Sequence, residues 1–175
     1  MNGNIEIWGN GNNGVTAYEG TQHAEVDQTL FQEISGIGTG QEVSFEFAHR
    51  GRVGTDVINF SITDLGIDNL FGTGDDTVLF SKNYSADTSG WVFNTNAGED
   101  PIITLGNDLR FAYFGVSTGS GDSRVGNFLD AAYFSVDGGV DVPEPSQPLS
   151  ILAIGIILGS GRLIKRKLTS NYMIF

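Results

Sequence analysis

Short runs of alternating apolar and polar residues, separated by glycine-rich turns, limit the fold of this chain more than any other feature. In residues 42–50, Val43, Phe45 and Phe47 would lie on one face of a strand, with polar side chains on the other. Similar runs cover residues 4–9, 30–35, 57–63, 77–81, 90–94, 102–105, 109–117 and 128–136. No segment before residue 142 keeps a helical period of about 3.6 residues. The pattern predicts an all-β fold, an antiparallel β-sandwich over residues 1–138.

The body of the protein is strongly acidic. Residues 1–142 contain 20 Asp and Glu side chains against five Lys and Arg, and the other four basic residues lie near the C-terminus. Binding to nucleic acid requires clustered basic side chains that face the phosphates, so we expect no nucleic-acid partner. The chain contains no cysteine, which excludes disulfides, thiolate metal sites and cysteine nucleophiles.

The C-terminal part consists of three segments of different character. In residues 139–147, Pro143 and Pro145 favour an extended backbone, as expected of a linker. An apolar helix over residues 146–164 would be about 28 Å long, close to the thickness of the hydrocarbon core of a bilayer. We therefore predict a linker over 139–147, a single transmembrane helix over 148–164 and a basic cytoplasmic tail over 165–175.

Basic side chains at the end of the apolar segment define the expected topology. The long side chain of Arg162 would extend to the headgroups. Lys165, Arg166 and Lys167 would remain on the cytoplasmic side, because positive charge is enriched there. The acidic body would then lie on the opposite side of the membrane.

The order of these segments resembles a known sorting signal. The motif Val142, Pro143, Glu144, Pro145 and Ser146, followed by an apolar helix and a basic cluster, resembles the PEP-CTERM signal of exported Gram-negative proteins. The resemblance implies that an exosortase-type membrane peptidase recognises the Pro-Glu-Pro motif. It also implies a single-pass protein of the bacterial inner membrane with a periplasmic body, released to the cell surface or extracellular matrix of exopolysaccharide-forming cells.

Two features depart from the pattern of that family. Residues 168–175 continue beyond the basic cluster, where such proteins normally end. The chain also begins without a positively charged segment followed by an apolar one, which would mark a signal peptide. We therefore expect that the sandwich domain lacks its first strand and its signal peptide.

The body resembles a second family. Residues 5–26, 45–57 and 125–136 are similar to a galactose-binding-like jelly-roll domain, which implies a carbohydrate-binding role. Aromatic rings can stack on sugars, and charged groups can bind hydroxyls. On this basis the candidate glycan-binding residues are Trp8, Tyr18, Glu19, His49, Arg50 and Arg52. Two alternatives stay open. Arg50 and Arg52 could form internal ion pairs with Asp56 or Glu46, and Trp91 could belong to the glycan-binding surface or to the core.

Three carboxylates are candidates for a structural calcium ion, and no other cofactor is expected. Asp75 and Asp76 lie in the glycine-containing turn 72–76, and hard cations bind several oxygen ligands in such loops. Asp130, in the closing strand, resembles an Asp that has a structural or calcium-binding role in carbohydrate-binding sandwiches. The alternative for Asp75 and Asp76 is a solvated acidic turn.

Three functional hypotheses follow from the sequence. The first is a non-enzymatic, exported surface or matrix protein that binds a polysaccharide and is sorted by its tail. The second is a structural or adhesive envelope module that binds proteins and no glycan. The third is a secreted hydrolase, which is disfavoured because the G-x-S-x-G match at residues 115–119 is not followed by a predicted helix.

Overall fold

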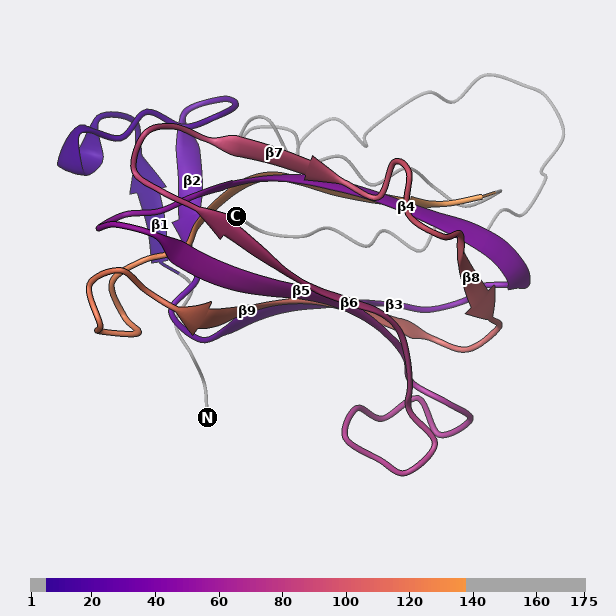
Figure 1. Ribbon diagram of the computed structural model, residues 1–175. Coiled ribbons are helices and arrows are strands. Elements are labelled where there is room, and N and C mark those ends of the chain that lie inside the picture. Colours follow the sequence, from indigo (N-terminus) through magenta and orange to yellow (C-terminus); the bar gives the residue numbers. More distant parts are fainter. Residues whose placement is uncertain (1–5, 138–175) are drawn as a thin grey trace, which may run out of the picture.

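The computed structural model describes residues 6–137, which form two antiparallel sheets that pack face to face (Figure 1). The prediction of an all-β, antiparallel sandwich is therefore confirmed. The predicted linker, transmembrane helix and basic tail lie outside the described residues. Within residues 6–137, no helix has the length and apolar character of a membrane-spanning segment.

The first sheet, sheet A, has six strands in the order β1-β2-β10-β4-β7, with β8 also paired to β4. Its strands are β1 (Glu6–Gly9), β2 (Gln22–Glu25), β4 (Thr39–Arg50), β7 (Val92–Thr95), β8 (Ile102–Leu105) and β10 (Phe128–Val136). Sheet B has four strands in the order β3-β9-β5-β6. These are β3 (Thr29–Ile34), β5 (Asp56–Asp64), β6 (Thr77–Ala86) and β9 (Leu109–Ser117). A short 3-10 turn, η1 (Asn12–Gly14), lies between β1 and β2.

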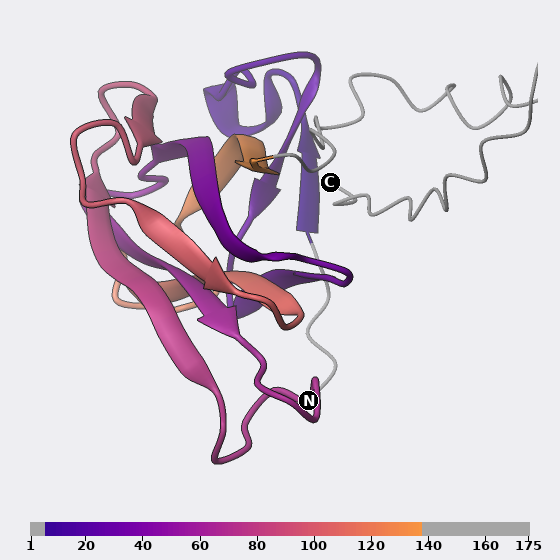
Figure 2. The same cartoon turned by 90° about the vertical axis from the view of Figure 1, so that its right-hand side faces the viewer.

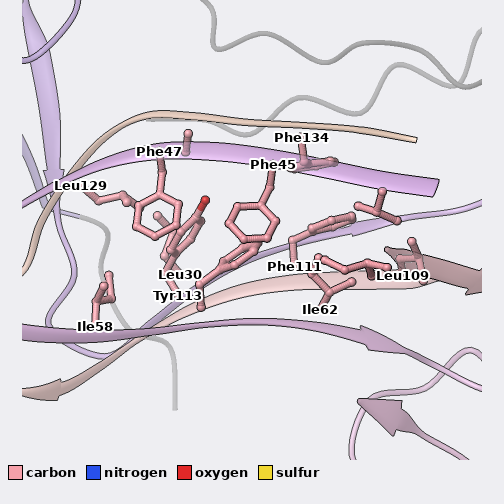
Figure 3. Packing of buried hydrophobic residues seen from close by; sticks show 14 of the residues in the cluster. Leu30, Phe45, Phe47, Ile58, Ile62, Leu109, Phe111, Tyr113, Leu129 and Phe134 are labelled. Carbon is pink, nitrogen blue, oxygen red and sulfur yellow. The ribbon is translucent and has the colours of Figure 1, made fainter. Parts of the chain in front are cut away.

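The core fills the space between the two sheets (Figure 3). Phe45 and Phe47 of β4 point from sheet A toward sheet B, where Phe60 and Tyr113 face them. The ring centroids of Phe45 and Phe60 are 4.5 Å apart, and those of Phe60 and Tyr113 are 4.7 Å apart. Each buried aromatic side chain contributes roughly 2–3 kcal/mol, so this block of rings supplies much of the folding free energy.

A bulge in β10 fixes which side chains of this strand face outward. The register with β4 shifts between Asp130 and Tyr133, and Ala131 has a left-handed backbone with φ of 48°. Before the bulge, Leu129 points into the core, so its neighbours Phe128 and Asp130 point to the outer face of sheet A. The outer face therefore receives one aromatic ring and one carboxylate from β10.

Candidate functional site

The outer face of sheet A carries a second aromatic cluster, separate from the core. Residues that pair directly across strands lie on one face, so Trp8 shares a face with His23, and Phe128 shares it with Arg50. The rings of His23 and Phe128 meet edge to face with centroids 4.8 Å apart. Trp91, just before β7, packs edge to face on His23 at 5.5 Å. The outer cluster thus consists of Trp8, His23, Phe128 and Trp91.

Trp91 of this cluster and two neighbouring rings, Tyr18 and Phe93, reach the solvent and form what we call the aromatic patch. Tyr18 is 46% exposed and Phe93 is 45% exposed. Their rings are nearly parallel, with an interplanar angle of 10° and centroids 5.8 Å apart. Trp91 lies edge-on to Tyr18 at 6.3 Å. The patch is therefore a set of ordered, accessible ring faces rather than scattered apolar side chains.

Asp130 holds the loop 10–21, which carries Tyr18, against sheet A. Its Oδ2 accepts hydrogen bonds from the backbone N–H groups of Tyr18 and Glu19, at 2.6 and 3.1 Å. The indole N–H of Trp91 donates to the carbonyl of Thr16 in the same loop at 2.9 Å. Burial raises the pKa of Asp130, and the backbone hydrogen bonds oppose that shift. In Figure 1 this loop lies next to the segment that leads into β7.

An ion pair covers the other side of the outer cluster. The Arg52 guanidinium donates to Glu25 Oε1 at 2.8 Å, and its carbon lies 4.6 Å from the centroid of the Trp8 ring. Glu25 is 2% exposed and also accepts from the backbone N–H of Gly126 at 2.8 Å. Burial raises the pKa of Glu25, while Arg52 lowers it. This ion pair covers the Trp8 side of the outer cluster, and the side that carries the aromatic patch remains exposed to solvent.

Several buried polar atoms around the outer cluster have no hydrogen-bond partner. They are Nε1 of Trp8, both ring nitrogens of His23 and Nε of Arg50. Such atoms are rare in native proteins and call for a physical explanation. Burial, followed by the charge of Arg50, lowers the pKa of His23, so the imidazole is neutral at pH 7. These atoms leave unused hydrogen-bonding capacity beneath the surface of the outer cluster and not on the aromatic patch.

The structure brings only half of the six predicted glycan-binding residues to the aromatic patch. Tyr18 belongs to the aromatic patch, and Glu19 follows it in the chain. Arg50 donates to the Thr88 carbonyl in the turn before Trp91. Trp8, in contrast, is only 7% exposed and lies beneath Arg52. His49 does not share this surface, because it is fully buried on the core-facing side of β4. Its Nε2 lies 3.0 Å from Oδ1 of Asn127. His49 is therefore a core residue, and its inclusion among the ligand-binding residues is corrected.

Arg52 follows the alternative reading of internal pairing, although with a different carboxylate. Its guanidinium binds Glu25, and only its backbone N–H donates to Asp56 Oδ2, at 2.8 Å. The sequence interpretation missed His23 and Phe93 and left Trp91 open. The spacing of two residues between Trp91 and Phe93 could have indicated one shared strand face.

The three calcium candidates do not come together. Asp130 holds the loop 10–21, whereas Asp75 and Asp76 lie in the loop 65–76, which extends from the opposite side of the sandwich in both views (Figures 1 and 2). Asp75 Oδ2 accepts from the N–H of Ile67 at 2.8 Å, and Asp76 Oδ2 accepts from that of Gly72 at 2.7 Å. Across residues 6–137, no three His, Asp or Glu side chains are grouped closely enough to hold a metal ion.

The comparisons with known proteins gave remote structural similarities only. The carbohydrate-binding module TmCBM61, solved in complex with beta-1,4-galactotriose, aligns with a TM-score of 0.45 and 15% identity, over 75% of this chain and 81% of that chain. A structure described as "CBM4 structure and function" aligns with a TM-score of 0.42 and 12% identity, over 80% and 86% respectively. No protein-family model and no curated protein matches the chain.

Proposed function

We propose that the sandwich is a non-enzymatic carbohydrate-binding domain of galactose-binding-like, jelly-roll type whose ligand stacks on the aromatic patch. The observation that carries the proposal is the ordered, half-exposed ring pair of Tyr18 and Phe93, which is nearly parallel. A sugar ring presents an apolar C–H face that fits such rings, and its hydroxyls need polar neighbours. Glu19 follows Tyr18 in the chain, and Arg50 donates to the carbonyl of Thr88, three residues before Trp91, so both are candidates to supply these contacts.

The loop geometry supports a binding role, because ring faces held in place cost little entropy on binding. Tyr18 is held by its backbone N–H to Asp130, and Trp91 by its indole N–H to Thr16. A pre-ordered surface loses less conformational freedom when a ligand binds, which increases affinity. Polysaccharide chains are the proposed ligand class.

Replacing Tyr18 or Phe93 by alanine is expected to weaken saccharide binding roughly tenfold, since one stacked ring contributes on the order of 1–2 kcal/mol. The measurement is a glycan array with the purified full chain, followed by calorimetry with the best ligand. Phe114→Ala is the matched control, because Phe114 is 51% exposed but belongs to sheet B. An equal loss in the Phe114 variant would contradict the placement of the site.

A protein-binding or adhesive module is the second candidate. It is favoured by apolar side chains that protrude from the loop 65–76, where Ile67 is 89% exposed, Leu70 is 61% exposed and Phe71 is 55% exposed. Failure to bind any saccharide, together with self-association that is lost on replacement of Leu70 by serine, would favour this candidate over the first.

We also propose that the tail sorts the protein, as a PEP-CTERM signal does. The support is the sequence alone: Val142 to Ser146, then an apolar segment, then Arg162 and the cluster Lys165, Arg166 and Lys167. The expected location is the inner membrane with a periplasmic body, and the cell surface or the exopolysaccharide matrix after processing.

Replacement of Pro143, Glu144 and Pro145 together by alanine is expected to abolish processing of an exported full chain in a host that contains an exosortase. The reason is that proline restricts the conformations of its own backbone and of the residue before it, so a Pro-Glu-Pro segment offers a peptidase few conformers to select from. Immunoblots of membrane and medium fractions would follow the shortened product, with Glu99→Ala as the control. The same product in a host without exosortase would refute the proposal.

A further inference from the structure

Arg50 differs from the other four Lys and Arg side chains in residues 6–137, because it forms no close ion pair, although its charge, after the hydrogen bonds from Ser89, helps to lower the pKa of nearby Asp87. The other four form ion pairs: Arg52 with Glu25, Lys82 with Glu99, Arg110 with Glu33 and Arg124 with Asp122. The charge of Arg50 is therefore compensated only at longer range, by Asp87, and its guanidinium can take a closer partner.

The surroundings of Arg50 place its charge beside the aromatic patch. Arg50 pairs with Phe128 across sheet A, so its side chain leaves the outer face next to the outer cluster. Its Nη2 donates to the carbonyl of Thr88 at 2.8 Å, in the turn that leads to Trp91. His23, which packs on Trp91, is close enough for Arg50 to lower its pKa.

The guanidinium retains hydrogen-bonding capacity. Only the bond from Nη2 to Thr88 uses a donor of the Arg50 side chain, and Nε is buried without a partner. Arginine binds carboxylates through two parallel N–H groups, and such charged bonds are stronger than bonds to neutral hydroxyls. The remaining Nη donors of Arg50 are therefore left for a carboxylate at the edge of the patch, whereas the buried Nε is out of reach of a ligand.

We propose that the saccharide bound at the aromatic patch is acidic, and that Arg50 binds its carboxylate while Tyr18 and Phe93 stack on its ring. This inference rests on the proposed function and specifies its ligand class, a uronate-containing polysaccharide. The rest of the domain is net negative and repels a polyanion. Local attraction by Arg50 must therefore exceed that repulsion, which makes the binding of an acidic ligand unusually dependent on this one residue.

The test uses the full chain on a glycan array that carries uronate oligosaccharides beside the same oligosaccharides with methyl-esterified carboxylates. We expect the uronates to bind more tightly than their esters. Arg50→Gln should weaken uronate binding roughly tenfold or more and bring it to the level of the ester. Lys82→Gln is the control, because it removes one positive charge from sheet B and changes the net charge equally.

The possible outcomes separate this inference from the proposed function. Binding of neutral saccharides alone, lost in Tyr18→Ala and unchanged in Arg50→Gln, would overturn the acidic ligand and leave carbohydrate binding intact. Uronate binding that is unchanged in Arg50→Gln would also overturn the role of Arg50. Absence of binding to every saccharide would overturn the proposed function itself. A thermal melt of the Arg50→Gln variant that matches the unsubstituted protein would show that the loss is not caused by unfolding.

Discussion

Replacing Asp56 by alanine is expected to lower the free energy of unfolding by about 4 kcal/mol, because three backbone N–H donors would lose their buried acceptor. Asp56 is fully buried at the start of β5. Its Oδ2 accepts from the backbone N–H groups of Arg52 and Asn127 at 2.8 and 2.9 Å, and its Oδ1 accepts from that of Gly119 at 2.6 Å. One carboxylate thus joins the turn before β5 to the segment between β9 and β10.

Urea unfolding followed by tryptophan fluorescence would measure the change in stability. Asp87→Ala is the matched control, because Asp87 is an exposed carboxylate that accepts from the N–H of Ser89 in a local turn. The Asp56 variant should unfold at a far lower urea concentration than the Asp87 variant. Similar midpoints for the two variants would show that the buried carboxylate does not stabilise the loops as inferred.

Acidification from pH 6.5 to pH 4 is expected to destabilise the protein through His49 by about 3 kcal/mol. Burial lowers the pKa of His49 from 6.5 to about 4, although the hydrogen bond with Asn127 and the charge of Asp56 raise it. In this window the unfolded chain takes up a proton that folded His49 does not bind. The contribution of neutral His49 to stability is therefore fully present above pH 6.5 and is lost as the pH falls toward 4.

Other titrating groups act in the same range, so a variant is needed to isolate His49. The lowered pKa of His23 adds to the loss, whereas the raised pKa values of Glu25 and Asp130 favour the folded state on acidification. His49→Gln retains a donor toward Asn127 but does not titrate. From pH 7 to pH 4, the free energy of unfolding of the unsubstituted protein should fall by about 3 kcal/mol relative to that of this variant. A difference that is constant with pH would refute the assignment.

Alternation in the sequence predicted the strands well wherever one face of a strand packs in the core. Residues 42–50 were recognised because Val43, Phe45 and Phe47 recur every second position, and all three are buried. β2 was missed, since His23 and Glu25 face the outer cluster and their polarity hides their burial. A polar residue that is buried on an outer face has no signature in a pattern of hydrophobicity.

The candidate site was predicted only in part. Alternation along one strand shows which face a residue lies on, but it does not show which distant segments become neighbours. The face of His49 was in principle readable, since it continues the core-facing series of Phe45 and Phe47. Tyr18 and Phe93, in contrast, meet through the fold of the loop 10–21 across sheet A, which no local pattern records. The pairing of Arg52 with Glu25 likewise depends on which strands become neighbours.

The hydrogen bonds from the loop 10–21 to Asp130 have a consequence for the order of folding steps during synthesis. Asp130 and Tyr18 are 112 positions apart in the chain, and β10 is the strand that joins β2 to β4. A nascent chain that has not yet released β10 from the ribosome cannot close sheet A or fasten the loop. Contacts over such long separations form slowly and late. The aromatic patch should therefore be completed in a single late step, after β10 has joined sheet A.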